Sequence, residues 1–313
     1  MVTLPSKRMI LSDRSTSGNG LSLRQCWAGR IAFVMAFAVL PSNLCTVYGE
    51  DRRAGIVEHE VQSAYSVIRI RRLGNIRSMI FVRDNGEEAY QSQINLANPH
   101  LLRFNYLQHM FTSYLLQPEQ KTVLVVGLGG GGMVHFLQKH DPSCEVDAVE
   151  IDPMVVQLAE RFFLLKRTKN VRLIVADAFE YFEQEEKKYD VIYMDAFLKP
   201  SESTDRTGAP LQMRTLDFYK QLQSRLTDGG SVVFNINPHP AMREDIATIV
   251  EAFPQTYVFK LPKAEGFVAI GSMQPVRLKP EAMRTAGRSL DRRFKTGFSF
   301  DTLASHLDAT IRN

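Results

Sequence analysis

A buried strand that runs into a glycine-rich turn constrains this chain more than any other feature. Residues 123–127 are apolar and lead into Gly127-Leu128-Gly129-Gly130-Gly131-Gly132, and residues 133–140 follow as a predicted helix. Glycine lets main-chain N–H groups approach a bound ligand because it has no side chain. The turn suits a dinucleotide or S-adenosylmethionine equally, but it lacks the lysine and hydroxyl of a phosphate loop, which disfavours a nucleoside triphosphate.

Strands and helices continue to alternate after this turn, which predicts a doubly wound, Rossmann-like α/β domain over residues 118–275. The expected strands are 146–151, 171–176, 191–194 and 232–236, and the expected helices are 153–165, 181–186, 213–226 and 244–253. We expect Asp228-Gly229-Gly230 to close the helix 213–226. Two last strands, 257–261 and 267–271, resemble the antiparallel hairpin that closes a class I methyltransferase sheet.

The segments on either side of this domain have other patterns. Residues 50–117 predict a small β-domain, with a turn at Asp84-Asn85-Gly86, followed by one amphipathic linker helix over 101–116. Residues 276–313 predict a basic tail that is helical in part, with a solvated face. The chain is therefore expected to hold a small β-domain, a cofactor-binding domain and a helical tail.

Residues 1–49 resemble a secretory leader. A basic stretch precedes ten uncharged residues, 31–40, and we predict cleavage after Gly49 with export to the periplasm or medium. The apolar run is too short for a stable membrane span, which needs about 20 residues. There are two alternatives. The start codon of a cytoplasmic enzyme is assigned too far upstream, or residues 1–49 are a disordered extension.

The net charge of the chain does not indicate a polyanionic partner. The leader carries five basic side chains against one acidic side chain, which equals the net charge of +4 of the whole chain. Residues 50–313 are therefore neutral, and we expect no nucleic acid partner.

Carboxylates follow the second and third predicted strands of the Rossmann-like domain. Glu150 stands about twenty residues beyond the glycine turn, where an acidic side chain accepts hydrogen bonds from ribose hydroxyls. Asp152 is expected to cap the helix that Pro153 opens. Asp177, followed by Ala178, supplies a second carboxylate for an adenine amino group, which favours S-adenosylmethionine over NAD. The alternative role for Asp177 is a helix N-cap.

Asp195 ends the fourth strand of the predicted sheet. Ligands of open α/β sheets bind at the carboxyl ends of the strands, so Asp195 is the candidate catalytic base, and the alternative is a hydrogen bond to loop amides. His109, His135 and His140 lack metal-ligand spacing, so we expect surface or capping roles for them and no metal.

Four segments, VLVVGLGGGG, AVEID, ADAFEY and YDVIYMDAF, stand in order and resemble the spermidine synthase family of aminopropyltransferases. Gln91-Ser92 and Phe104-x-Tyr106 extend the resemblance, which covers residues 60–272. It implies a class I methyltransferase fold, decarboxylated S-adenosylmethionine as donor and a diamine such as putrescine as acceptor. It also implies release of methylthioadenosine and assembly as a homodimer or tetramer.

Three departures from the family pattern concern acidic residues. Gly130 stands where the synthases carry an aspartate that grips the donor amine, and Leu198-Lys199 stands where a second aspartate binds the diamine. The segment 102–108 lacks the acids of the family's DEF-x-YHE pattern. Lys199 and Arg103 would repel a dication, so the diamine reaction is in question.

Three functional hypotheses result from these patterns. The first is aminopropyl transfer from S-adenosylmethionine, in its decarboxylated form, to a small amine or another nucleophile. The second is methyl transfer from S-adenosylmethionine to an unknown acceptor, and the third is an exported, non-catalytic nucleoside-binding protein. In the enzyme hypotheses Asp195 is catalytic, and the predicted cofactor contacts are Gly127, Gly129, Gly131, Glu150, Asp177, Ala178 and Gln91.

Overall fold

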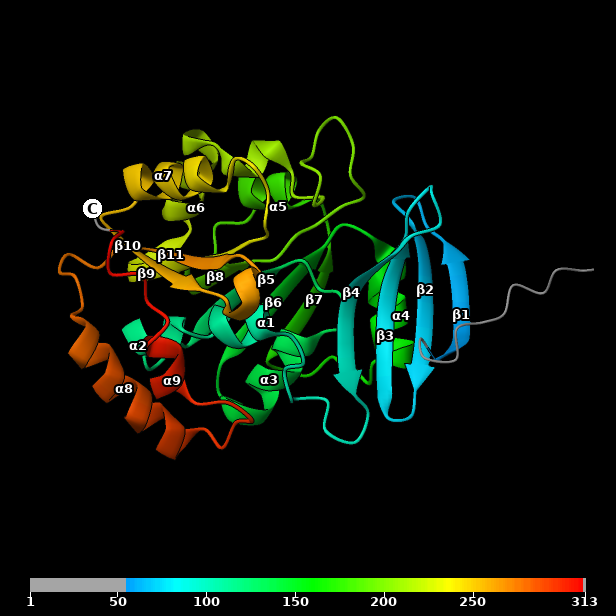
Figure 1. The fold of residues 1–313 in the computed structure, drawn as a ribbon, viewed down its shortest axis with the longest axis horizontal. Coiled ribbons are helices and arrows are strands. Elements are labelled where there is room, and N and C mark those ends of the chain that lie inside the picture. Colours follow the sequence, from blue (N-terminus) through cyan, green and yellow to red (C-terminus); the bar gives the residue numbers. More distant parts are fainter. Residues whose placement is uncertain (1–54, 312–313) are drawn as a thin grey trace, which may run out of the picture. The chain divides into compact units, whose positions relative to one another are not determined.

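Residues 55–311 are described in the computed structural model, apart from the side chain of Ala264. Their strands form two sheets, with helices on both faces of the larger one (Figure 1). The predicted leader, its cleavage and the export that it implies fall outside the described residues. Between residues 55 and 311, no helix combines the length and the apolar character needed to cross a membrane.

The smaller sheet is an antiparallel meander of neighbouring strands. In spatial order it contains β1 (Ile56–Gln62), β2 (Val67–Leu73), β3 (Ile76–Val82) and β4 (Glu88–Asn95). Residues alternate along β2, so Ile68 and Ile70 are buried, while Arg69 and Arg71 lie on the opposite face and pair with Glu88. This alternation gives the sheet one apolar face.

The larger sheet is mostly parallel and has the order β10-β11-β9-β8-β5-β6-β7. Its strands are β5 (Thr122–Val126), β6 (Glu145–Glu150), β7 (Val171–Val175), β8 (Tyr189–Met194), β9 (Leu226–Ile236), β10 (Gln255–Lys260) and β11 (Phe267–Ser272). The pairs among β5 to β9 are parallel, and the hairpin β10–β11 adds to β9 in antiparallel fashion. The predicted Rossmann-like methyltransferase fold is thereby confirmed.

Helices cover both faces of this sheet (Figure 1). One face carries α5 (Ala178–Gln184), α6 (Leu216–Ser224) and α7 (Met242–Ala252). The other carries α1 (Asn105–Met110), α2 (Ser113–Leu116), α3 (Gly132–His140), α8 (Pro280–Arg293) and α9 (Phe300–Ala304). The described chain also contains two 3₁₀ turns, η2 (Leu211–Arg214) and η3 (Pro262–Ala264).

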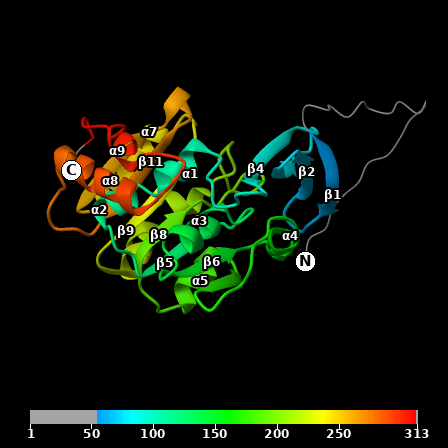
Figure 2. The ribbon, with the colours of Figure 1, turned by 90° about the horizontal axis from the view of Figure 1, so that it is seen from below.

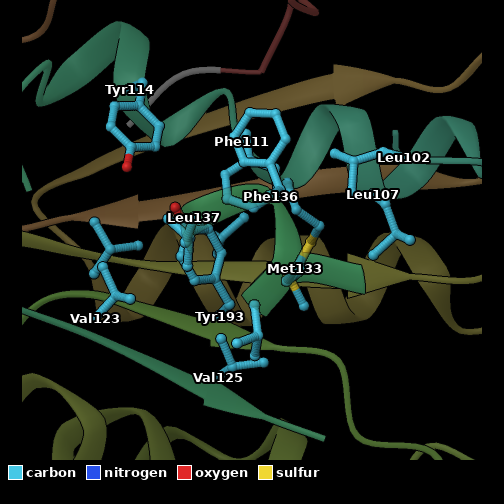
Figure 3. Close-up of a cluster of buried hydrophobic side chains, with 14 of the residues drawn as sticks. Leu102, Leu107, Phe111, Tyr114, Val123, Val125, Met133, Phe136, Leu137 and Tyr193 are labelled. Carbon is cyan, nitrogen blue, oxygen red and sulfur yellow. The ribbon is translucent and has the colours of Figure 1, made fainter. Parts of the chain in front are cut away.

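The central strand β5 is buried on both faces. Val123 and Val125 join the cluster formed with α1, α2, α3 and α8, part of which Figure 3 shows around Phe111 and Tyr193. Leu124 and Val126 join the cluster formed with α5, α6 and α7. A strand that buries both faces reads as a continuous apolar run, which is why residues 123–127 predicted it.

Helix α4 (Pro153–Phe162) packs against both sheets. It packs Val156 toward the larger sheet and Val155 and Leu158 against the apolar face of the smaller sheet, where they meet Ile68 and Ile70. Figures 1 and 2 both show α4 against the smaller sheet. This contact positions β4 beside the glycine turn.

Two expectations from the sequence are wrong in detail. The predicted linker helix 101–116 is broken into α1 and α2, because the buried Thr112 donates both its N–H and its hydroxyl to the carbonyl of His109. The predicted helix 213–226 ends at Ser224, and Asp228-Gly229-Gly230 lies inside β9 as a bulge instead of closing the helix. Pairing of Leu226 with Tyr189 extends the strand back to that point.

A buried carboxylate, Asp147, braces the inner strand β6. Its side chain is 2% exposed and accepts hydrogen bonds from Arg172 at 2.7 and 2.6 Å and from the Tyr189 hydroxyl at 2.7 Å, with the Lys187 ammonium at 3.0 Å. Burial alone would raise the pKa of Asp147, but these partners outweigh it and hold the pKa below its ordinary value. The ionised form therefore stabilises the fold.

We predict that Asp147→Asn lowers the free energy of unfolding at pH 7 by about 1–3 kcal/mol, since charged hydrogen bonds are lost. Because the folded pKa is lowered, this stabilisation is present above the unfolded pKa of about 3.9 and disappears as pH falls through the folded pKa. Urea unfolding between pH 3 and 7 measures the difference. Glu185→Gln, at the more exposed partner of Arg172, serves as control, and equal effects of the two changes would contradict the prediction.

Candidate functional site

The order of the strands places the predicted polar residues along one edge of the larger sheet. From β7 through β6, β5 and β8 to β9, this edge presents Asp177, Glu150, Gly127, Asp195 and Asn235. All five line a cavity of about 770 Å³. The cavity lies at the carboxyl ends of parallel strands, where ligands of open α/β sheets bind.

Gly127 is required by the path of the chain. Its φ is +92°, and a Cβ atom at this position would stand 2.3 Å from the main-chain oxygen of Asp195. Asp195 approaches so closely because its N–H donates to the carbonyl of Val126 at 2.9 Å. The glycine therefore allows β5 and β8 to bring the candidate base beside the turn.

The other glycines of the turn differ in what they face. Gly129, with φ +52°, lines the cavity next to Ser92. Gly131, with φ +74°, is the N-cap residue of α3 and packs against Leu165, and it is not among the cavity-lining residues. Its backbone conformation and this close packing account for the glycine at position 131.

A side chain at position 130 would also point away from the cavity. A Cβ atom there would lie 2.6 Å from the ring of Phe163 and 2.8 Å from the hydroxyl of Ser92. Phe163 is fully buried, so its ring has no open space into which it could move. In this chain the space next to position 130 is filled by the packing of the smaller sheet and α4 against the turn.

Glu150 is held in place by the main chain. Its Oε2 accepts the N–H of Leu128 at 2.9 Å, and its Oε1 accepts the N–H of Asp152 at 3.1 Å. Burial raises the pKa of Glu150, while these N–H donors act in the opposite direction. A carboxylate has about four acceptor sites, so Glu150 keeps acceptor capacity for a ribose hydroxyl in the cavity.

Asp177 has the N-cap role that was the alternative for it, and it also lies at the cavity. Its Oδ1 accepts the N–H of Phe179 at 2.7 Å and so caps α5, while the residue itself lines the cavity together with Ala178. No other donor within residues 55–311 reaches its Oδ2 atom, which is available to a ligand. Asp152, by contrast, caps α4 through Met154 as expected.

The smaller sheet closes one wall of the cavity. Gln91 and Ser92, on β4, are lining residues, and Ser92 lies against Gly129. The amide of Gln91 donates only a long hydrogen bond of 3.3 Å to the carbonyl of Ala89. The residue predicted from the N-terminal resemblance is therefore brought to the same cavity as Glu150 and Asp177.

Asp195 stands at the centre of a three-residue cluster. The Asn235 amide donates to its Oδ1 at 2.8 Å, and the Tyr106 hydroxyl donates to its Oδ2 at 3.3 Å. Burial raises the pKa of the Asp195 carboxyl to about 7, although both hydrogen bonds act to lower it. Burial and the carboxylate raise the pKa of Tyr106 well above its ordinary value, so its hydroxyl stays protonated and donates.

Sequence reasoning missed the partnership of Tyr106 and Asn235 with Asp195. Tyr106 comes from α1 and Asn235 from β9, which lie 89 and 40 residues from Asp195 in the chain. The motif Phe104-x-Tyr106 was a signal for the first residue. For Asn235 the only signal was its place at the end of a strand. A side chain that faces an active site from a distant element leaves no local spacing to detect.

Arg103 and Lys199, which were expected to repel a dication in the site, do not line the larger cavity. Arg103 lines a separate cavity of about 230 Å³. Lys199 pairs with Asp84 and is not a lining residue of the larger cavity. Two arginines that the sequence did not single out, Arg83 and Arg206, line it instead. The wall that they form follows from the contact between the segment 196–213 and the smaller sheet.

Two of the three histidines are placed differently from the expectation, while His140 is half-buried in the last turn of α3. His109 and His135 are buried rather than at the surface. The ring of His109 contacts His306 at 2.9 Å, and the ring of His135 contacts the carbonyl of Phe163 at 2.8 Å. Across residues 55–311, no three His, Cys, Asp or Glu side chains gather in the manner of metal ligands.

Comparisons with known proteins show which sequences this chain resembles. Residues 105–268 match the family described as "Spermine/spermidine synthase domain". The polyamine aminopropyltransferase of Vibrio vulnificus is 28% identical over 236 residues, which cover 74% of this chain and 77% of that protein.

Two solved structures share the fold. Spermidine synthase in complex with the transition state analogue AdoDATO aligns with a TM-score of 0.61 at 20% identity, over 80% of this chain and 84% of that chain. Human methyltransferase-like protein 13 in complex with SAH aligns with a TM-score of 0.57 at 22% identity, over 62% and 94% of the two chains. The same fold thus accompanies two transfer chemistries.

We predict that Gly130→Asp does not create a contact to a ligand and destabilises the protein by about 1–3 kcal/mol, because the added side chain overpacks the space held by Phe163 and Ser92. Thermal unfolding of the full chain measures this. Gly132→Ala is the matched control, since its added Cβ meets only a Leu107 methyl at 3.7 Å. Unchanged stability of Gly130→Asp would show that the space is open.

Proposed function

The chain belongs to the spermine/spermidine synthase family, and from this premise we propose that it is a transferase using S-adenosylmethionine, in its decarboxylated form, as aminopropyl donor to an amine acceptor. The observation that carries the proposal is the line of Asp177, Glu150, Gly127 and Asp195 along one cavity wall. It offers two carboxylates for a nucleoside and a third carboxylate beside them for chemistry.

The nucleoside part of the donor fits the wall made by β5, β6 and β7. Glu150 is fixed by two main-chain donors and keeps acceptor capacity for ribose hydroxyls. Asp177 offers Oδ2 to an adenine amino group, and Gly129 exposes main chain where a side chain would otherwise stand. Gln91 approaches from the smaller sheet. These residues bind and orient the donor.

The reaction needs positioning and the removal of one proton. When bound, the donor supplies a carbon next to a sulfonium, where a bond to the acceptor nitrogen forms as the carbon–sulfur bond breaks and methylthioadenosine leaves. The chain's contribution is to hold both partners in line, which supplies most of the rate of such a displacement. The nitrogen also loses a proton, and a base must receive it.

Asp195 is suited to receive this proton. Its pKa of about 7 lies close to neutral pH, where a general base is most effective. Asn235 and Tyr106 each donate to one of its oxygens, and they orient the carboxylate toward the cavity. In this mechanism Asp195 is the catalytic residue, and Asn235 and Tyr106 are positioning residues.

Methyl transfer from S-adenosylmethionine is the second candidate, and a specific observation favours it. Position 130, where the synthases carry an acid for the donor amine, is packed against Phe163 and faces away from the cavity. S-adenosylmethionine carries a carboxylate next to its amine, and no acidic side chain at position 130 repels that carboxylate. The relative affinity of the protein for S-adenosylmethionine and for its decarboxylated form therefore distinguishes the two reactions.

We predict that the full-length protein binds methylthioadenosine and prefers decarboxylated S-adenosylmethionine to S-adenosylmethionine, as measured by titration calorimetry. Glu150→Gln should weaken binding at least about tenfold, since a charged acceptor of hydrogen bonds is lost. Glu180→Gln, at an exposed position outside the cavity, is the control and should bind normally. Preference for S-adenosylmethionine would select methyl transfer, and no binding would contradict both enzyme proposals.

We predict that kcat/KM rises with pH through about 7 and then levels, because the basic form of Asp195 accumulates above its pKa. Asp195→Asn should lower turnover about 10²–10⁴-fold and leave methylthioadenosine binding intact. Asn235→Ala removes a hydrogen bond that lowers this pKa, so the inflection should move to higher pH. A profile without an inflection near 7, or unchanged turnover of Asp195→Asn, would reject the assigned base.

A further inference from the structure

The part of the cavity beyond Asp195 differs in charge from the part that we assign to the donor. Strand order puts Glu150 and Asp177 on one side of Gly127, and it puts Asp195 and then Asn235 on the other. The segment 196–213 follows Asp195 directly, and Lys199 in it pairs with Asp84 in the turn between β3 and β4, so this segment and this turn enclose the second side. Among the lining residues that these described segments contribute, none is acidic.

The same wall carries two arginines. Arg206 lines the cavity and is exposed, and within residues 55–311 it has no hydrogen-bond or ion-pair partner. Arg83 lines the cavity from the end of β3, and it gives one hydrogen bond of 3.1 Å from Nη1 to the exposed Glu87. The Nε atom of Arg83 is buried and has no partner. Both arginines therefore have N–H groups available for an anion in this part of the cavity.

The carboxylates near these arginines are already engaged. Asp84 pairs with Lys199, which ties the segment 196–213 to the turn between β3 and β4. Asp205 accepts from Arg214 at 2.6 Å and from the hydroxyl of Thr207 at 2.7 Å. Neither carboxylate is a lining residue of the cavity. The second ammonium group of a diamine would therefore find no free carboxylate to pair with in this part of the cavity.

A buried ionic cluster keeps this wall in place. Arg214 bridges Asp205 and Asp245, at 2.6 and 3.2 Å, and His239 contacts Asp245 at 3.0 Å. The cluster joins the segment that carries Arg206 to the start of α7. The position of Arg206 beside the cavity is thus a feature of the folded chain rather than of an isolated loop.

We propose that the acceptor is an amine that also carries an anionic group, a carboxylate or a phosphate, and that Arg206 and Arg83 bind this group while Asp195 receives the proton of the amine. The inference rests on the proposed transferase function. It follows from the chemistry of the wall, because guanidinium groups form strong charge-assisted hydrogen bonds with carboxylates and phosphates and repel an ammonium.

The test compares acceptors of matched length in the full-length protein. Putrescine, 4-aminobutyrate and 3-aminopropyl phosphate share a primary amine and differ in the group at the other end. With the donor form that binds, product masses and kcat/KM are measured by mass spectrometry. We expect 4-aminobutyrate or 3-aminopropyl phosphate to exceed putrescine at least about tenfold in kcat/KM. The more active of the two identifies carboxylate or phosphate as the anion.

Preference for putrescine, or turnover of neither anionic amine, overturns the inference. Binding of methylthioadenosine, measured in parallel, separates this result from a failure of the proposed function. If methylthioadenosine binds and putrescine is preferred, the transferase stands and the anionic acceptor falls. If neither donor form nor methylthioadenosine binds, the transferase itself is rejected, and the inference falls with it.

Charge reversal tests the assigned arginine directly. Arg206→Glu should reduce the ratio of kcat/KM for the anionic amine to that for putrescine at least about tenfold, and Arg206→Lys should retain most of the ratio. Arg243→Glu, the same change at an exposed position on α7 outside the cavity, should leave the ratio unchanged. Normal methylthioadenosine binding shows that Arg206→Glu is folded. An unchanged ratio in Arg206→Glu would overturn the inference.

Discussion

The parallel pairing of β5 with β6 on one side and β8 on the other is the constraint on which the site depends. Parallel strands end at the same edge, so this pairing brings Glu150 and Asp195 to the two sides of the glycine turn. The backbone of Asp195 passes so close to Gly127 that no side chain fits between them. These two hydrogen-bonded ladders therefore set the positions of the glycine turn, Glu150 and Asp195 at one edge of the cavity.

Helix α4 and the smaller sheet decide how this edge is enclosed. The apolar contacts of Val155 and Leu158 with the sheet hold β4 over the glycine turn, and Ser92 and Phe163 fill the space next to Gly130. The space that a side chain at position 130 would occupy is thus filled by neighbouring side chains and is not open to the cavity. The same enclosure makes the region around Asp195 poor in water, which raises its pKa.

Charge is divided within the cavity between its two sides. Carboxylates face the side that suits a nucleoside, whereas guanidinium groups face the other side, and the nearby acids Asp84 and Asp205 are neutralised by Lys199 and Arg214. A diamine, which carries a second ammonium group, would need acidic partners on that side. The fold and the donor side can remain the same while the acceptor side changes, because the acceptor wall belongs to a loop and to a separate sheet.

The sequence by itself determined the Rossmann-like sheet, the glycine turn and the strand-end carboxylates Glu150, Asp177 and Asp195. These features are local, since a buried apolar run, a turn and the next polar residue are adjacent in the chain. Only the tertiary structure decided that Tyr106 and Asn235 hold Asp195, that Thr112 breaks the predicted linker helix, and that Arg206 rather than Arg103 or Lys199 faces the cavity. These depend on contacts between elements far apart in the chain, and no local pattern of residues encodes such contacts.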